Sequence, residues 1–170
     1  MSCLSSRNMN IVLYEPEIPA NTGNIGRTCV ATNTTLHLIE PLGFKLNDKM
    51  IKRAGMDYWE KLDYIRYIDY KEYTDYYASL RDIGLWYVST KASRCYTEVR
   101  FGPEDHLMFG PESRGIPEDI LRAHPERCIR IPMAEGERSL NLSNAVNIVL
   151  YEALRQNDFR GLSLYGHIPE

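Results

Sequence analysis

Six short runs rich in β-branched and aromatic residues alternate along the chain with helix-like segments. The predicted strands span residues 10–15, 36–40, 64–68, 85–90, 106–110 and 127–133, and the predicted helices span residues 22–32, 48–55, 70–82, 117–123 and 139–157. Strands that alternate with helices are typical of βαβ units, in which the strands run parallel. The sequence therefore predicts an α/β fold with a mainly parallel sheet flanked by helices.

The chain has 170 residues, of which 44% are hydrophobic, and this suits one domain with its own core. We expect a disordered or extended leader over residues 1–9, a single domain over residues 10–157 and a C-terminal tail over residues 158–170. No apolar run approaches the roughly 20 residues of a membrane span, and the first residues lack the apolar core of a signal peptide. We therefore expect a cytoplasmic protein with no membrane partner.

The charged and metal-ligating residues argue against several functions. A formal net charge of −3 argues against a protein that coats nucleic acid through bulk positive charge, although it allows a local basic patch. The four cysteines and four histidines are dispersed, without a Cys-x-x-Cys pair, so the sequence predicts neither a metal site nor a disulfide framework. The twelve tyrosines could belong to the core, to an interface or to a stacking surface, and sequence alone does not divide them.

Three polar loops follow predicted strands. The first, NTGNIGR at residues 21–27, has a G-x-x-G spacing that does not match the G-x-G-x-x-G dinucleotide fingerprint. The second is GPESRG at residues 110–115, and the third lies within residues 131–145. Ligands of open α/β sheets bind at the carboxyl ends of strands, so the three loops together predict one composite pocket.

Each loop also has a plain structural interpretation. Asn21 and Thr22 in the first loop, and Ser139 or Asn141 in the third, are residue types that cap helix N-termini. In the second loop, Gly-Pro can form a tight turn, and Glu112 can be half of a surface ion pair. Taken singly, the loops do not decide between these interpretations and ligand binding.

The closing helix is apolar nearly all round. Its apolar residues leave little polar face before Glu152 and Arg155. A helix of this kind is buried on more than one side. Two explanations remain open at this point, because the second buried side can face a partner subunit or the protein's own core.

Three stretches resemble the motifs of a known family, namely NIVLYEPEIPANTGNIGR from Asn10, LMFGPESRGIP from Leu107 and IPMAEGERSLNLSNAVNIVLYEA from Ile131. Together and in this order they resemble the three signature motifs of the SPOUT superfamily of RNA 2′-O-methyltransferases. More closely, the chain resembles the compact tRNA (cytidine/uridine-34-2′-O)-methyltransferase subfamily. The resemblance extends from Met9 to about Asn157, and the combination is far more specific than any single motif.

The resemblance implies an α/β fold with a deep trefoil knot near the C-terminus and S-adenosylmethionine bound inside that knot. It also implies an obligate homodimer whose active site is completed across the interface. The RNA partner would be the anticodon stem-loop of tRNA, methylated on the ribose of the wobble nucleotide 34, and no metal is required. Gly110 would let the backbone approach the cofactor. Mapped residue by residue, the cofactor-binding residues are Val88, Thr90, Gly110, Ile131, Met133, Ser139, Leu140 and Asn141.

The same resemblance assigns six residues to catalysis or RNA binding: Arg27, Asn21, Glu112, Asn141, Arg138 and Tyr151. The arginine matching Arg27 is proposed in similar enzymes to activate the 2′-hydroxyl. A guanidinium stays protonated, so we expect it instead to hold the adjacent phosphate and stabilise developing charge, while a phosphate oxygen or water takes the proton. Asn21 is expected to orient Arg27 or the ribose, and Glu112 to fix the first motif across the pocket. Asn141 is expected to contact the ribose or to support the cofactor loop.

The densest basic stretch contains Lys45, Lys49, Lys52 and Arg53. It can contact phosphates of the anticodon stem-loop, with Tyr58 or Trp59 stacking on bases, or it can be a solvated helix face. Three other functions stay open: methylation of another RNA such as rRNA, a non-catalytic RNA- or nucleotide-binding knotted dimer, and an unrelated Rossmann-type dehydrogenase.

Overall fold

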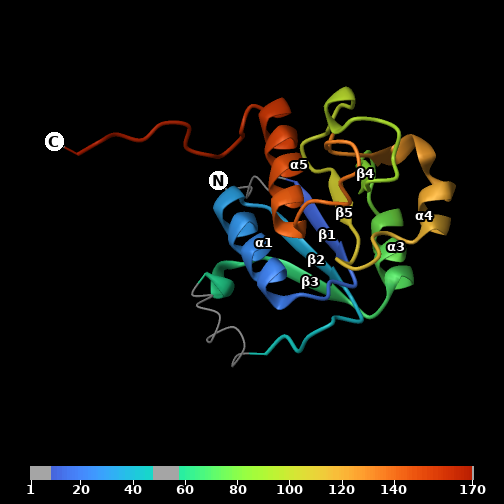
Figure 1. Cartoon of the computed structure of the whole chain (residues 1–170). Coiled ribbons are helices and arrows are strands. Elements are labelled where there is room, and N and C mark those ends of the chain that lie inside the picture. Colours follow the sequence, from blue (N-terminus) through green and yellow to red (C-terminus); the bar gives the residue numbers. More distant parts are fainter. Residues whose placement is uncertain (1–8, 48–57, 170) are drawn as a thin grey trace.

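The computed structural model describes residues 9–47 and 58–169 (Figure 1). In this part of the chain, six strands form one sheet in the order β3-β2-β1-β5-β4-β6, and every neighbouring pair is parallel. The strands are β1 (Asn10–Tyr14), β2 (Thr35–Ile39), β3 (Tyr64–Tyr67), β4 (Leu85–Val88), β5 (His106–Phe109) and β6 (Cys128–Ile129). The predicted α/β class with a parallel sheet is therefore confirmed.

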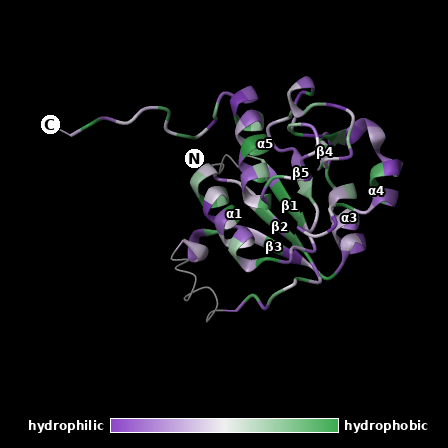
Figure 2. Ribbon diagram, viewed as in Figure 1, coloured by the Kyte–Doolittle hydropathy of each residue, from purple (hydrophilic) through white to green (hydrophobic). Residues whose placement is uncertain are grey.

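Helices cover both faces of the sheet (Figure 1). They are α1 (Pro19–Thr32), α3 (Tyr70–Ala78), α4 (Glu118–Ala123) and α5 (Leu142–Gln156), with short 3-10 turns η1 (Trp59–Lys61), η2 (Tyr96–Glu98) and η3 (Pro125–Arg127). One buried cluster joins α1 and α5 to the sheet, and a second joins α3 and α4 to its other face. Figure 2 shows the apolar residues gathered in the central strands between these layers. No helix of the described ranges is long and apolar enough to cross a membrane.

The first helix begins earlier than the sequence predicts. It starts at Pro19 rather than at Thr22, because proline at the first helical position has a backbone angle already set for the helix. The N-cap is Ile18, so the expectation that Asn21 or Thr22 caps this helix is wrong. Residues 21–27, which the sequence analysis treats as a polar loop overlapping the start of the predicted helix 22–32, all lie inside the helix.

Other boundaries also differ from the prediction. β6 has two residues instead of the predicted 127–133, and α5 begins at Leu142 because Asn141 is its N-cap, accepting a hydrogen bond from the Ser143 amide (3.0 Å). Met9, assigned to the leader, is 1% exposed and belongs to the core. Residues 1–8 and the predicted helix at 48–55 lie outside the described residues.

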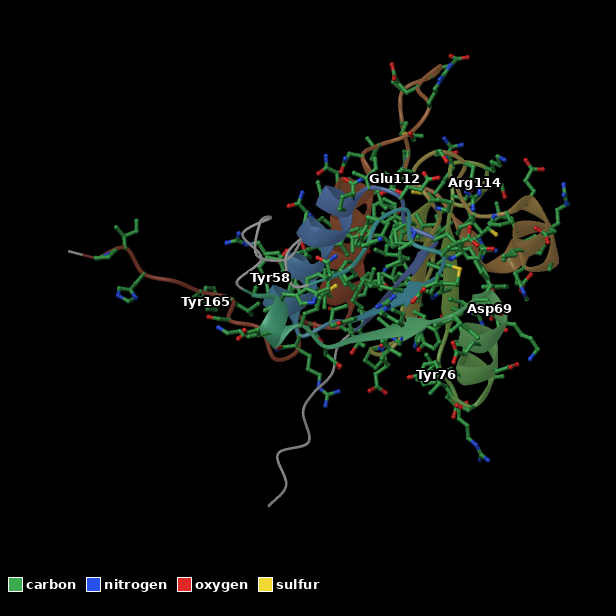
Figure 3. All side chains as sticks on the ribbon, turned by 90° about the horizontal axis from the view of Figure 1, so that it is seen from below. Tyr58, Asp69, Tyr76, Glu112, Arg114 and Tyr165 are labelled. Carbon is green, nitrogen blue, oxygen red and sulfur yellow. The ribbon has the colours of Figure 1, made fainter. Side chains whose placement is uncertain are left out.

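The C-terminal tail extends away from the body of the molecule (Figure 1). Its first part still packs on the core through Phe159 and Leu162, whereas Leu164, Tyr165 and Ile168 are exposed. Figure 3 shows Tyr165 far from the sheet.

Most of the tyrosines pack in the core beside α3. Buried or partly buried members of this aromatic cluster are Tyr14, Tyr67, Tyr70, Tyr73, Tyr76, Tyr77 and Tyr87, together with His37 and His106. The rings of His37 and His106 lie 4.9 Å apart, and Tyr73 Oη lies 2.9 Å from His106 Nδ1. Asp69 fixes the start of α3 by accepting a hydrogen bond from the Glu72 amide, and Tyr76 of the cluster follows about two turns later (Figure 3).

Because His106 is buried, we predict that the folded protein loses stability at mildly acidic pH. Its side chain is 1% exposed, and burial lowers its pKa to about 4 from the usual 6.5. Between these values the unfolded chain binds the proton and the folded chain does not, so stability is complete above pH 6.5 and falls as the pH drops toward 4. We expect the contribution of His106 to the free energy of unfolding to be about 2 kcal/mol smaller at pH 5 than at pH 7.5.

Denaturant unfolding at both pH values tests this prediction. His106→Asn retains an acceptor for Tyr73 but has no proton to take up. Its loss of stability between pH 7.5 and pH 5 should therefore be about 2 kcal/mol smaller than that of the unmodified protein. His167→Asn in the exposed tail is the matched control and should behave as the unmodified protein. An unchanged pH dependence in His106→Asn would contradict the assignment.

Candidate active site

The site begins where the strand order reverses. From β1 the chain continues to β2 and β3 in one direction, while β5, β4 and β6 lie on the other side of β1. The loops after β1 and β5 therefore meet at the carboxyl edge of the sheet, which is where ligands of open α/β folds bind.

A cavity of about 590 Å³ lies at this edge. Three groups of residues line it: the start of α1 with the β5 loop, the end of β4 with the residues that follow it, and several residues within 131–145. All eight residues predicted to bind cofactor line this cavity: Val88, Thr90, Gly110, Ile131, Met133, Ser139, Leu140 and Asn141. The structure thus brings together segments that are far apart in the sequence.

The cavity also has walls that the sequence analysis missed. Ser89 and Lys91 line it, and both directly follow β4. Lys91 is held by an ion pair with Glu118 at the start of α4, with a distance of 2.5 Å from Nζ to Oε1. The signal available for these two residues was their position at the end of a predicted parallel strand, since Ser89 lies in the last part of the predicted strand 85–90 and Lys91 follows it.

The packing of its own loop requires a glycine at position 110. A Cβ atom at this position would lie 2.1 Å from the amide nitrogen of Ile116 and 2.2 Å from the carbonyl carbon of Gly115. These are backbone atoms of the same loop, so the absent side chain leaves room for the loop to fold back on β5. Close approach of the loop backbone is enough to exclude every other residue here, and the approach of the cofactor to Gly110 stays a prediction.

Glu112 connects the β5 loop to the start of α1. Its carboxylate accepts hydrogen bonds from the amides of Glu17 (2.8 Å) and Ile18 (3.1 Å) and from the side-chain amide of Asn21 (3.1 Å). The N-cap residue Ile18 makes no side-chain capping bond, and Glu112 from another segment binds the N-cap amide and the amide before it. This agrees with the expectation that Glu112 fixes the first motif.

A chain of hydrogen bonds extends this connection to the third segment. The side-chain amide of Asn141 donates to Asn21 Oδ1 (3.0 Å), and Asn21 donates in turn to Glu112. Asn141 also caps α5 through the amides of Ser143 and Asn144. The side chains of Asn21, Glu112 and Asn141 therefore hold three cavity walls together.

Arg27 and Tyr151 lie outside this cavity. They line a second, smaller hollow of about 420 Å³ on the outer side of α1 and α5. Arg27 is exposed, and its guanidinium lies over the Tyr58 ring at 5.9 Å from the centroid. Arg138, by contrast, is exposed and lines the first cavity, the one of about 590 Å³. The structure of one chain thus divides the predicted catalytic residues between two hollows.

The predicted RNA-stacking role does not fit Trp59. Its side chain is 7% exposed and packs in the core against Tyr64. Tyr58 is half-buried, and its hydroxyl donates to the carbonyl of Gly23, so its ring and not its hydroxyl faces Arg27. Of the basic stretch, Lys45 is exposed, while Lys49, Lys52 and Arg53 lie outside the described residues.

A family model described as the SpoU rRNA methylase family matches residues 8–151. The chain belongs to this family. Among its relatives, the tRNA (cytidine(34)-2′-O)-methyltransferase of Escherichia coli is 49% identical over 157 residues, which cover 92% of this chain and 98% of the relative. The protein of the same name from Saccharophagus degradans is 48% identical and covers 89% of this chain and 97% of the relative.

A solved structure also resembles this SpoU-family chain. It is described as giving insight into 2′-OH methylation of C/U34 on tRNA, and it superposes with a TM-score of 0.81 at 43% identity, covering 89% of this chain and 97% of the other. A family member from Streptomyces viridochromogenes, solved with its cofactor AdoMet, superposes with a TM-score of 0.77 at 24% identity and shows the shared fold.

Proposed function

We propose that this protein transfers a methyl group from S-adenosylmethionine to the ribose 2′-oxygen of the wobble nucleotide 34, cytidine or uridine, in the anticodon loop of tRNA. The observation that carries the proposal is the similarity to enzymes named for this reaction. Almost half of the aligned residues are identical, and the alignments cover nearly the whole of both chains. The cavity at the strand switch point supports it, because it is walled by all the residues that resemble the family's cofactor site.

The cavity fits the cofactor in size and chemistry. Its volume of about 590 Å³ lies within the ~300–1,000 Å³ of small-molecule sites. Apolar side chains such as Val88, Ile131 and Leu140 suit an adenine ring, and the hydroxyls of Thr90 and Ser139 offer polar contacts. When bound, S-adenosylmethionine supplies a methyl group already activated by the positive sulfonium.

The proposed enzyme acts as a homodimer that pairs the outer faces of α1 and α5. Ile148 and Tyr151 on α5 are 38% and 46% exposed, although the rest of this helix buries Val146, Val149 and Leu150. A second copy of the chain placed on this face covers these side chains, which agrees with a helix that is apolar nearly all round. It also brings Arg27 of one chain to the cavity of the other. The trefoil knot stays part of the same proposal.

The roles of the chain's own residues follow from their positions. Arg27 forms no ion pair with a carboxylate among the described residues, so its guanidinium can hold an RNA phosphate and stabilise negative charge on the 2′-oxygen. Arg138, exposed at the cavity, is placed for a second phosphate. Asn21, Glu112 and Asn141 hold the walls in register, and Asn21 faces the cavity where the ribose would enter.

Mapping of the methylated nucleotide tests the proposal. Purified protein is incubated with S-adenosylmethionine and small RNA from cells that lack the gene, and new 2′-O-methyl groups are located by mass spectrometry. We expect methylation at nucleotide 34 of a small set of tRNAs. A new methyl group on rRNA would show that rRNA, and not tRNA, is the substrate. Intact cofactor binding without any new methyl group would favour a non-catalytic RNA-binding dimer.

A further inference from the structure

Two loops of the site are joined by hydrogen bonds in both directions, because each loop supplies a carboxylate that accepts from the other loop. Glu112 of the β5 loop accepts the amides of Glu17 and Ile18 in the β1 loop. In return, the Glu17 carboxylate accepts the amide (2.9 Å) and the hydroxyl (2.7 Å) of Ser113 in the β5 loop. We call these four residues the two-loop clamp.

An arginine adds charge to the clamp. The Arg114 guanidinium forms an ion pair with Glu15 and lies 3.6 Å from Glu17, as measured from Nη1 to Oε1 (Figure 3 labels Glu112 and Arg114). The hydrogen bonds from Ser113 hold the pKa of the Glu17 carboxyl below its usual range, so this side chain is charged at neutral pH. A charged acceptor makes stronger hydrogen bonds than a neutral one.

The clamp joins two parts of the proposed machinery without itself containing the cofactor. Residues 110–115 form a wall of the cavity, whereas Glu17 is not among the residues that line it. Glu17 lies two residues before the first residue of α1, the helix that carries Asn21 into the cavity and Arg27 onto the outer surface. The clamp therefore couples the position of the β5 loop to that of the start of α1.

We propose that Glu17 is a positioning residue, which ties the cofactor-binding wall at residues 110–115 to the helix that presents Arg27. The inference rests on the proposed function and names a residue that resemblance to the family did not assign. It has two consequences: the loss of Glu17 weakens S-adenosylmethionine binding without removing any contact to it, and it frees the Ser113 amide.

The experiment compares Glu17→Ala and Glu17→Gln with the unmodified full chain. Calorimetric titration with S-adenosylmethionine should give an affinity about tenfold weaker for Glu17→Ala, the size expected for lost charge-assisted hydrogen bonds. Glu17→Gln keeps an acceptor for Ser113 but loses the charge facing Arg114, so it should regain part of the affinity. Hydrogen exchange should speed up at the Ser113 amide in Glu17→Ala and less so in Glu17→Gln.

Kinetics separate positioning from general damage. In Glu17→Ala the KM for S-adenosylmethionine should rise with the weaker affinity, while the KM for tRNA should change little. Glu40→Gln is the matched control, because Glu40 also forms a half-exposed ion pair at the sheet edge, 2.6 Å from Arg66, but joins neither loop of the clamp. It should leave cofactor affinity unchanged.

The outcomes distinguish the inference from the proposed function. If the unmodified protein fails to bind S-adenosylmethionine, the proposed function itself is wrong. If it binds and Glu17→Ala binds equally well, or if Glu40→Gln loses as much affinity, the positioning role of Glu17 is overturned. Equal exchange of the Ser113 amide in all variants would overturn the clamp independently of any activity.

Discussion

Replacing Gly110 by alanine is expected to abolish cofactor binding. The added methyl carbon would lie 2.1 Å from the Ile116 amide nitrogen and 2.2 Å from the Gly115 carbonyl carbon, far inside van der Waals contact. Both are backbone atoms, so the β5 loop must move away from the strand. Displacements of about 1 Å can cost on the order of a hundredfold in function, and we expect S-adenosylmethionine affinity to fall at least that much.

The free energy of unfolding should also fall in Gly110→Ala, by about 2 kcal/mol, as for other overpacked sites. Calorimetric titration and denaturant unfolding measure the two effects separately. Gly166→Ala is the matched control, because a Cβ at that position meets nothing within 4 Å. If Gly110→Ala bound the cofactor normally, the loop would have to tolerate a side chain that the structure excludes.

The sheet was predictable because each strand is a short apolar run between helix-like segments. Val12, Leu38 and Leu107 are fully buried in strands predicted by that pattern. The start of α1 was not predictable in the same way. The amide of its N-cap, Ile18, is bound by Glu112, which lies 94 residues further along the chain. Local capping rules therefore favoured Asn21, whose side chain is used elsewhere.

The cavity walls were found from the sequence because ligand sites follow parallel strands, and the family motifs mark the same loops. Two kinds of residue escaped that reasoning. Trp59 has a side chain typical of base stacking, yet it fills a space beside Gly26 in the core, where a Cβ would lie 3.3 Å from its ring. Glu17 was passed over because its role depends on Ser113, a tertiary partner that no local pattern reveals.

Arg27→Ala is expected to lower the rate of methyl transfer by about 10²–10³-fold, the cost of removing one group that stabilises transition-state charge. Arg27 lies in the outer hollow and not among the residues of the cofactor cavity, so S-adenosylmethionine affinity should stay within about twofold, as for independent sites. Stability should fall by only about 0.5 kcal/mol, for the exposed contact with Tyr58.

Single-turnover rates and calorimetric titration check these expectations. Arg122→Ala is the matched control, since this exposed arginine on α4 pairs with Glu118 (3.1 Å) and lies on the other face of the sheet. Full activity in Arg27→Ala would remove Arg27 from the mechanism. A parallel loss of cofactor affinity would instead place it in the cofactor site of its own chain.

Mixed dimers decide which chain supplies Arg27. Leu140→Trp puts a bulky ring on the partly exposed wall of the cavity and should block cofactor binding, so both this variant and Arg27→Ala are inactive alone. If the site forms across the interface, a purified dimer of one Arg27→Ala chain and one Leu140→Trp chain contains one intact site and regains about half the activity of the unmodified dimer. If each site uses its own Arg27, the mixed dimer contains no intact site and stays inactive. The division of the site between two hollows of one chain therefore predicts recovery, and an inactive mixed dimer would contradict the shared site.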